Sequence, residues 1–446
     1  MNKFNLLSSS LLLLCVSIVF PTSGQEVLAA FGVTLKNDPE AFTVEVPENN
    51  STLLFLLDNR SIKARLFDKN LTLVDSLDGE RPSKSELPKL LGHCRSGNLV
   101  TLFFSSQYHN SFAAVHFDLT GKQVTSEDLK LPVANERFAG AISADENFYI
   151  FSTEKTALKL YAFRADASYE MKTYDVPSGK SGTFSKNLTA IFRKDTAEPM
   201  DLDFPPTLRL ASNTQKLYCY PDRLVLTIDS DPSETTLVAI DRKTLKEEIR
   251  SYAQGKTECT ESVTSNSYLR GGYLYQVIYC IKRMVFRIVD LENDRLVREN
   301  TITDDDELHY ANGDEPTRSR PFLRKCAEDG GLIFVYRIPR ALVVTFGGYT
   351  IMGSGPSYSG VRTVELKSLL DPTTFEPLNG MLMPETILDR IKEFKSNIGK
   401  EYYAFGSTKT VDTMFLRGKE HILGYFDSVK NRYHLVSFGD SVVAAN

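Results

Sequence analysis

Short segments with alternating apolar and polar residues recur along the chain, and they come in pairs joined by a short polar turn. The first segment of each pair ends in a charged residue, and a second alternating segment returns after the turn. A period of two gives a strand one buried face, so each pair predicts a β-hairpin. The first strands of the seven hairpins end at Asp68, Asp118, Arg164, Asp241, Asp290, Lys367 and Asp427.

Aspartate ends the first strand in five of the seven hairpins. A carboxylate at this position can accept hydrogen bonds from backbone N–H groups about two residues further on, which favours the chain reversal. The sixth hairpin is weaker than the others, because Pro372 interrupts its returning segment.

More continuously apolar runs precede most hairpins, for example Leu53–Leu57, Leu99–Phe104 and Leu332–Tyr336. This composition is typical of strands that are covered on both faces. One further strand can be placed upstream, so each unit has about four strands. Successive strand ends lie between 46 residues (Asp118 to Arg164) and 77 residues (Arg164 to Asp241) apart. Because a four-stranded blade needs about 40–50 residues, the longest steps hold insertions.

The hairpin array resembles the β-propeller superfamily over about residues 40–440, in architecture only. The resemblance implies an all-β fold of four-stranded antiparallel blades that close radially. Seven blades are expected, with six or eight as alternatives. A Gly-His…Trp-Asp signature is excluded because the sequence has no Trp, and regularly spaced kelch double glycines are absent. In general style the chain is similar to uncharacterised secreted propellers of bacterial envelopes, which implies no activity.

One short helix is expected near residues 384–398. Pro384 suits its first turn and Gly399 its end. Its apolar stripe comprises Ile387, Leu388, Ile391, Phe394 and Ile398. The stripe should pack on the propeller, with a partner helix as the alternative.

Residues 1–24 are predicted to be a signal peptide, followed by a single propeller domain over 25–446. Lys3 precedes an apolar core, and Pro21 and small residues come before Gln25. A retained membrane anchor is the alternative, although the core is shorter than the ~20 residues that span a bilayer. The predicted location is secreted, periplasmic or cell-surface, with no transmembrane segment after cleavage.

Charge and cysteine content restrict the possible partners. The chain without its leader has 51 basic and 57 acidic residues, a net charge of −6, which opposes a nucleic-acid partner. Five cysteines remain after the leader, so at least one is unpaired. Cys259 and Cys280 are the pair to test first, since an exported protein can form disulfides. We expect a monomer that needs no cofactor.

Long insertions should gather on one rim of a propeller, where they would form any binding site. They are predicted at Asp175–Gln215, Thr301–Lys325, Pro372–Lys400 and Pro339–Gly360. The last of these contains a glycine-rich stretch, 347–360, which is interpreted as a flexible rim loop because a strand follows it where a phosphate cradle would need a helix.

The densest polar cluster lies in the second insertion. Its carboxylates Asp304, Asp305 and Asp306 could bind Ca²⁺, and His309, Tyr310, Arg318 and Arg320 could form an acid–base site for an anionic sugar. The competing interpretation is a solvated acidic loop, which charge runs usually are. His93-Cys94 lacks a second pair at zinc-ligand spacing.

Two functions are compatible with this sequence. The first is a binding or scaffold module whose rim loops contact a protein or polysaccharide. The second is a polysaccharide lyase or glycoside hydrolase with its active site in the long rim loops. Convergence of His309, Tyr310 and two arginines in a central pocket would favour the enzyme, and their dispersal over the outside would favour the binding module.

Overall fold

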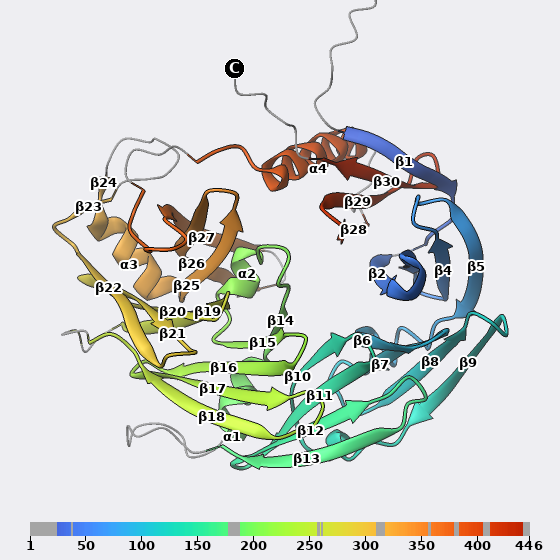
Figure 1. Ribbon diagram of the computed structural model, residues 1–446, viewed down its shortest axis with the longest axis horizontal. Coiled ribbons are helices and arrows are strands. Elements are labelled where there is room, and N and C mark those ends of the chain that lie inside the picture. The colour runs from blue at the N-terminus through green and yellow to red at the C-terminus, as the bar shows by residue number, and fades with distance from the viewer. Residues whose placement is uncertain are drawn as a thin grey trace, which may run out of the picture.

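The alternating segments form strands in a computed structural model that describes residues 25–36, 39–176, 188–256, 259, 262–308, 317–355, 358–378, 383–404 and 411–439. Seven sheets stand around a ring (Figure 1), so the propeller expectation and its seven blades are confirmed. The predicted signal peptide, residues 1–24, lies outside the described residues.

Four blades have the expected four antiparallel strands in sequence order. Blade 1 contains β2 (Glu40–Val46), β3 (Ser51–Leu57), β4 (Ser61–Phe67) and β5 (Leu73–Glu80); blade 2 contains β6 (Lys89–Ser96), β7 (Leu99–Ser105), β8 (Phe112–Asp118) and β9 (Gln123–Leu129); blade 3 contains β10 (Arg137–Ala144), β11 (Asn147–Glu154), β12 (Ala157–Phe163) and β13 (Tyr169–Asp175); blade 5 contains β19 (Thr264–Arg270), β20 (Tyr273–Cys280), β21 (Arg283–Asp290) and β22 (Arg295–Thr303).

Burial follows the sequence pattern within each blade. All seven residues of β3 are buried, as its continuous apolar run predicts. The outermost strand β9 is mostly exposed.

Blade 4 has a fifth strand that comes from the insertion before it. It contains β15 (Gln215–Cys219), β16 (Arg223–Asp231), β17 (Glu234–Asp241) and β18 (Glu247–Ala253), with the short β14 (Glu198–Met200) parallel to β15. The same insertion holds the helices α1 (Leu188–Lys194) and α2 (Leu208–Ala211). Of two 3-10 turns, Pro47–Asn49 joins β2 to β3 within blade 1, and Pro132–Asn135 lies in the connection from blade 2 to blade 3.

Blade 6 has only three strands, and here the sequence prediction was wrong. They are β25 (Gly331–Ile338), β26 (Ala341–Gly355) and β27 (Tyr358–Leu370). The predicted loop Pro339–Gly360 is mostly strand β26, in which Gly347 pairs with Glu365. The interrupted return after Pro372 makes one isolated bridge, Leu370 to Pro377, in place of a fourth strand.

Blade 7 closes the ring with both ends of the domain. Its strands are β28 (Asp412–Arg417), β29 (Glu420–Asp427), β30 (Arg432–Phe438) and, outermost, β1 (Gln25–Gly32), which pairs antiparallel with β30. The hairpin ending at Asp427 therefore supplies the second and third strands of this blade, whereas the first five hairpins supply the third and fourth strands of theirs.

The five aspartates do stabilise their turns as the pattern predicts. In each case Oδ1 accepts two backbone N–H groups of the turn; for Asp118 these are Thr120 at 2.9 Å and Gly121 at 2.8 Å. The other four are Asp68, Asp241, Asp290 and Asp427.

The predicted helix is α4 (Ile387–Ala404), which starts three residues after Pro384 and continues beyond Gly399. Thr386 and Asp389 exchange hydrogen bonds at its first turn, a reciprocal cap. The stripe packs on blade 7: Ile391 is buried against Leu423 and Val436. A second long helix, α3 (Ser319–Asp329), was not predicted. Among the described helices, none is long and apolar enough to cross a membrane.

Buried apolar clusters join neighbouring blades, with one exception. Single clusters span blades 1 and 2, 2 and 3, 3 and 4, 4 to 6, and 7 and 1. Across the described residues, blades 6 and 7 share no such cluster, and each has its own. Figure 1 shows α4 beside blade 7 at this junction.

Candidate functional site

The polar cluster predicted as a site follows β22 at the outer edge of the ring. Its described part contains a small hairpin of β23 (Glu307–Leu308) and β24 (Thr317–Arg318), which Figure 1 shows at the periphery. Arg318 and Arg320 are exposed, and Arg320 lies 3.9 Å from the Asp304 carboxylate. His309 and Tyr310 lie outside the described residues.

In this cluster the carboxylate of Asp306 stabilises the turn that follows β22. Asp306 accepts from the backbone N–H of Thr303 at 2.6 Å and from its hydroxyl at 2.9 Å, and these hydrogen bonds hold the pKa of Asp306 below its usual range. Asp305 is exposed. Nowhere in the described part of the chain do three His, Cys, Asp or Glu side chains group as a metal site would require. The acid–base site stays a prediction, because His309 and Tyr310 lie outside the described residues.

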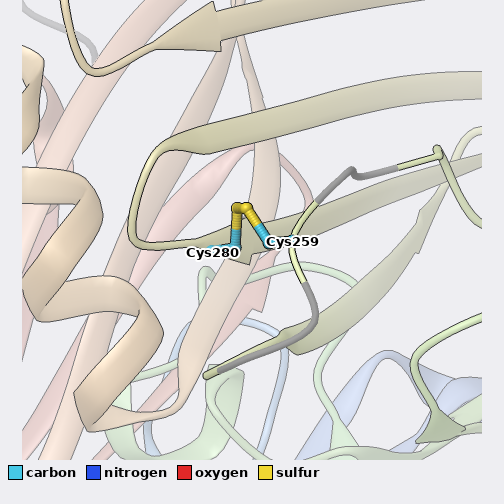
Figure 2. Close-up of a disulfide and its surroundings, with 2 residues drawn as sticks. All are labelled: Cys259 and Cys280. Atoms are coloured by element: carbon cyan, nitrogen blue, oxygen red, sulfur yellow. A yellow bond between two sulfur atoms is a disulfide. The ribbon is translucent and has the colours of Figure 1, made fainter.

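Cys259 and Cys280, the pair chosen from the sequence, form a disulfide (Figure 2). Cys280 ends β20, while Cys259 lies in the connection from blade 4 to blade 5. The bond fixes this connection on the blade. Cys94, Cys219 and Cys326 are free thiols, and burial raises the pKa of Cys94 to about 12, so this thiol is unreactive at neutral pH.

Long connections gather on one rim of the ring. On that rim lie links from the outer strand of one blade to the inner strand of the next, including those from β13 to β15 and from β22 to β25. On the opposite rim the turns are short: residues 97–98 join β6 to β7, and residues 339–340 join β25 to β26.

A pocket of about 450 Å³ opens on the rim with the long connections, where blades 4, 5 and 6 meet. The insertion before blade 4 contributes Asp195, Ser212 and Thr214 to its wall. Strand ends contribute Gln215 of β15, Asp229 and Ser230 of β16, Thr264 and Ser265 of β19, and Gly331 of β25, and the lining is completed by Ala190, Ile191, Pro232, Val263 and Gly330. We call this the rim pocket. Its lining combines hydroxyl, amide and carboxylate side chains with apolar ones.

A buried polar layer lies between blades 4 and 5 beneath the rim pocket. Asp229, 2% exposed, accepts hydrogen bonds from the hydroxyls of Thr235 and Ser267, both at 2.7 Å. Thr235 in turn accepts from the amides of Gln254 at 2.8 Å and Gln276 at 3.0 Å. Burial raises the pKa of Asp229, against the hydrogen bonds and the positive charge of Lys216.

Lys216 ties this layer to the pocket wall. Its side chain is fully buried, and Nζ donates to Oδ1 of Asn266 at 2.8 Å and to the backbone carbonyl of Asn213. Burial lowers the pKa of Lys216 to about 8, although the Asp229 carboxylate raises it. The Asn266 amide donates to the carbonyls of Ser212 and Asn213, both at 3.3 Å. Blade 5 thus positions the segment that forms one wall of the rim pocket.

Buried charge is not confined to this junction: Arg81, whose side chain is fully buried, donates to the backbone carbonyls of Asp58 and Pro88 between blades 1 and 2. On the opposite face of blade 4, Leu217, Leu226 and Ile228 pack with blade 3 in an apolar cluster. A buried charged layer costs solvation free energy that apolar packing does not. The layer of Lys216 and Asp229 lies at the junction that opens into the rim pocket.

The sequence prediction missed the residues of this layer. The signal available for them was a lysine and an aspartate inside apolar strands, at Lys216 and Asp229, which is where a charged side chain needs a buried partner.

Comparisons with known proteins place the chain in no family. No family model matches the sequence, and no curated protein matches it. Three solved structures show the range of similarity. A dihydro-heme d1 dehydrogenase NirN in complex with DHE is 13% identical, with a TM-score of 0.35 over 87% of this chain, which spans 62% of that protein's length. The WD40 domain of SCAP from fission yeast is 9% identical, with a TM-score of 0.37 over 93% of this chain and 98% of that domain. The Dos1 propeller is 9% identical, with a TM-score of 0.40 over 93% of this chain and 95% of that one.

The class of protein defined by this fold is the seven-bladed β-propeller, and the sheet order of the chain itself establishes it.

Proposed function

We propose that this protein is an exported binding module that holds a polar group of a protein or polysaccharide ligand in the rim pocket. The observation that carries the proposal is the construction of the rim pocket. Three blades and an insertion contribute hydroxyl, amide and carboxylate side chains to one wall, and the buried layer of Lys216 and Asp229 fixes that wall in place. Preorganised polar groups in a concave site reduce the ordering cost of binding.

The size of the rim pocket supports a ligand group of limited length. About 450 Å³ falls in the lower part of the ~300–1,000 Å³ range of small-molecule sites. A larger protein or polymer would insert one residue or sugar unit there and contact the surrounding connections.

Export is supported by the signal-peptide pattern and by the disulfide. Strand β1 starts at Gln25, so the proposed cleavage before this residue leaves the closing strand of blade 7 intact. The Cys259–Cys280 bond would be stable in an oxidising compartment. Mass spectrometry of the expressed protein tests both points: a mature N-terminus at Gln25 with the two cysteines bonded is expected. A retained leader with reduced cysteines would contradict export.

Binding is tested by a thermal-shift screen of glycans and peptides on the purified protein, repeated with a variant that fills the pocket. Thr214→Trp places a large side chain in the wall, whereas Thr125→Trp places it on the exposed outer strand β9 as a matched control. A ligand whose shift disappears in Thr214→Trp and persists in Thr125→Trp is the expected result. If ligands bind both variants equally, the binding site lies outside the rim pocket.

A further inference from the structure

A second cleft, of about 520 Å³, lies between blades 4 and 5 on the rim with the short turns. Its lining comes from the ends of β16, β17, β19 and β20 at that rim, from the outer strand β18, and from Leu291 after β21. We call it the tyrosine cleft, because Tyr220, Tyr252 and Tyr273 line it. It shares no lining residue with the rim pocket, which opens on the opposite rim.

The interior of the tyrosine cleft is apolar. Val225 and Leu237 of blade 4 and Leu269 of blade 5 line it, and all three belong to one buried apolar cluster. A sugar with several hydroxyls would leave some of them without a partner against these side chains, whereas an apolar group would not. The tyrosine rings add a preference for an aromatic group, since aromatic pairs gain more than the area they bury.

Arg250 joins the two blades at the outer side of this cleft. Its Nη1 donates to the backbone carbonyl of Leu291 at 3.1 Å, and its Nε donates to the carboxylate of Glu248 on the same strand at 2.7 Å. The first hydrogen bond connects the outer strand of blade 4 to blade 5. The second offsets the charge of the guanidinium, so Arg250 contributes to the shape of the cleft and little to its net charge.

Arg223 is the cation of the lining whose donors remain available. Its guanidinium carbon lies 6.0 Å from the centre of the Tyr220 ring, a cation–π contact that holds it beside the cleft. Within the part of the chain that the structure describes, this guanidinium makes no hydrogen bond, and its ion pair with the exposed Asp222 is long, at 3.7 Å. A free guanidinium binds a carboxylate or a phosphate through two N–H groups.

The other charges of the lining favour the carboxylate. Glu248 is paired with Arg250, and Glu292, on the blade 5 side, is an exposed carboxylate. One available guanidinium with a carboxylate on the facing blade matches a single negative charge better than the nearly double charge of a phosphate monoester. Because Arg223 belongs to blade 4, the ligand anion should lie on that side.

We propose that the tyrosine cleft binds an aromatic ring that carries a carboxylate, with the ring in the apolar interior and the carboxylate at Arg223. The inference goes beyond the proposed function, because it adds a site on the rim opposite the rim pocket. Two sources supply this chemistry: a small aromatic acid, and the C-terminal aromatic residue of a polypeptide. The test separates them.

The test uses two probe pairs that differ only in the charge of the carboxyl group. One pair is 3-phenylpropionate and 3-phenylpropionamide; the other is N-acetyl-glycyl-phenylalanine and its C-terminal amide. Isothermal titration on the purified protein gives the dissociation constants. At least one acid should bind about fivefold more tightly than its amide, as expected for an exposed ion pair. A preference confined to the dipeptide identifies a polypeptide C-terminus as the source, and a preference shown by phenylpropionate identifies a small acid.

Two variants assign the effect to the tyrosine cleft. Arg223→Gln should weaken the binding of the acid about fivefold, to the level of its amide, and leave the amide unchanged. Arg340→Gln is the matched control, because Arg340 is exposed in the turn from β25 to β26, on the same rim and outside the cleft. Ala239→Phe, which fills the cleft, should remove binding of both acid and amide while the circular dichroism spectrum stays that of the parent chain.

Equal binding of acids and amides, no binding of either acid at millimolar concentration, or an acid preference that persists in Arg223→Gln would overturn the inference. Because Arg223 is exposed, its replacement keeps the fold and decides the proposal by itself. The proposed function is judged separately, since it depends on ligands that are sensitive to Thr214→Trp.

Discussion

Replacing Asp229 by asparagine is the most direct perturbation of the buried polar layer. The carboxylate accepts from two hydroxyls, Thr235 and Ser267. An amide of the same shape keeps one acceptor, so one hydrogen bond to a charged group is lost, worth about 1.5–3 kcal/mol.

The second contribution comes from Lys216, which loses its nearby negative charge. The resulting loss of stability is limited, because the pKa of Lys216 is about 8 and neutralising this side chain near neutral pH costs only about 1 kcal/mol. The two contributions together predict that Asp229→Asn lowers the free energy of unfolding by about 3 kcal/mol. Urea titration followed by circular dichroism measures it, with Asp305→Asn as the control that changes little.

The pH dependence of the same variant provides a second readout. The pKa of Lys216 is lower in the folded chain than in the unfolded one, so the unfolded chain binds more protons between about pH 8 and pH 10. Stability due to Lys216 therefore rises with pH in this window. Without the Asp229 carboxylate the folded pKa falls further, and the rise begins below pH 8. If Asp229→Asn costs no more than Asp305→Asn and leaves the pH profile unchanged, the account of a buried charged layer is refuted.

Three further predictions concern the ring. Phe31→Ala in the closing strand removes ring contacts with Phe67 and Tyr433 and should lower the free energy of unfolding, measured by urea titration, by about 1–2 kcal/mol. An unchanged free energy of unfolding would mean that β1 contributes little to ring closure. Ile391→Ala in α4 should lower the free energy of unfolding by about 2–4 kcal/mol and increase hydrogen exchange first in blades 6 and 7. A uniform increase of exchange over all blades would argue against a weak junction between blades 6 and 7. Hydrogen bonds from Asn293 and Glu292 hold the pKa of Asp290 below its usual range. This turn therefore stabilises the fold above about pH 4 and loses its contribution as the pH falls. In an acid titration, Asp290→Ala should reduce the difference between the free energies of unfolding at pH 7 and at pH 3.

The blade repeat could be predicted because its signals are local. Alternation within seven or eight residues defines a strand, and an aspartate accepting N–H groups two and three residues later defines the turn, as Asp118 does. Helix α4 was predictable for the same reason, since its stripe and first turn lie within one segment. Helix α3 carries a comparable local signal in Phe322, Leu323, Cys326 and Ala327, which are all buried. The charged segment before this helix favours a loop and masks that signal.

Blade 6 could not be predicted because the reason for its glycines is tertiary. A Cβ on Gly348 would lie 3.1 Å from Cα of Cys326 in α3, and one on Gly347 would lie 2.2 Å from the carbonyl oxygen of Val364. These glycines permit close packing of a helix and a neighbouring strand on β26. Read locally, the same residues indicate a loop. Strand β1 was missed likewise, since its partner β30 lies at the other end of the chain.

Local sequence patterns could not predict the rim pocket, for a related reason. Its acceptors and the layer beneath it come from β15, β16, β17, β19 and β20, and each residue alone has an ordinary role in a strand or turn. Only the pairing of blades 4 and 5 brings Lys216 against Asn266, and Asp229 against Ser267. The sequence pattern limited a site to one rim, because that rim carries the insertions. Burying the charges of Lys216 and Asp229 costs solvation free energy, and their hydrogen bonds across blades 4 and 5 hold the wall of the rim pocket in place.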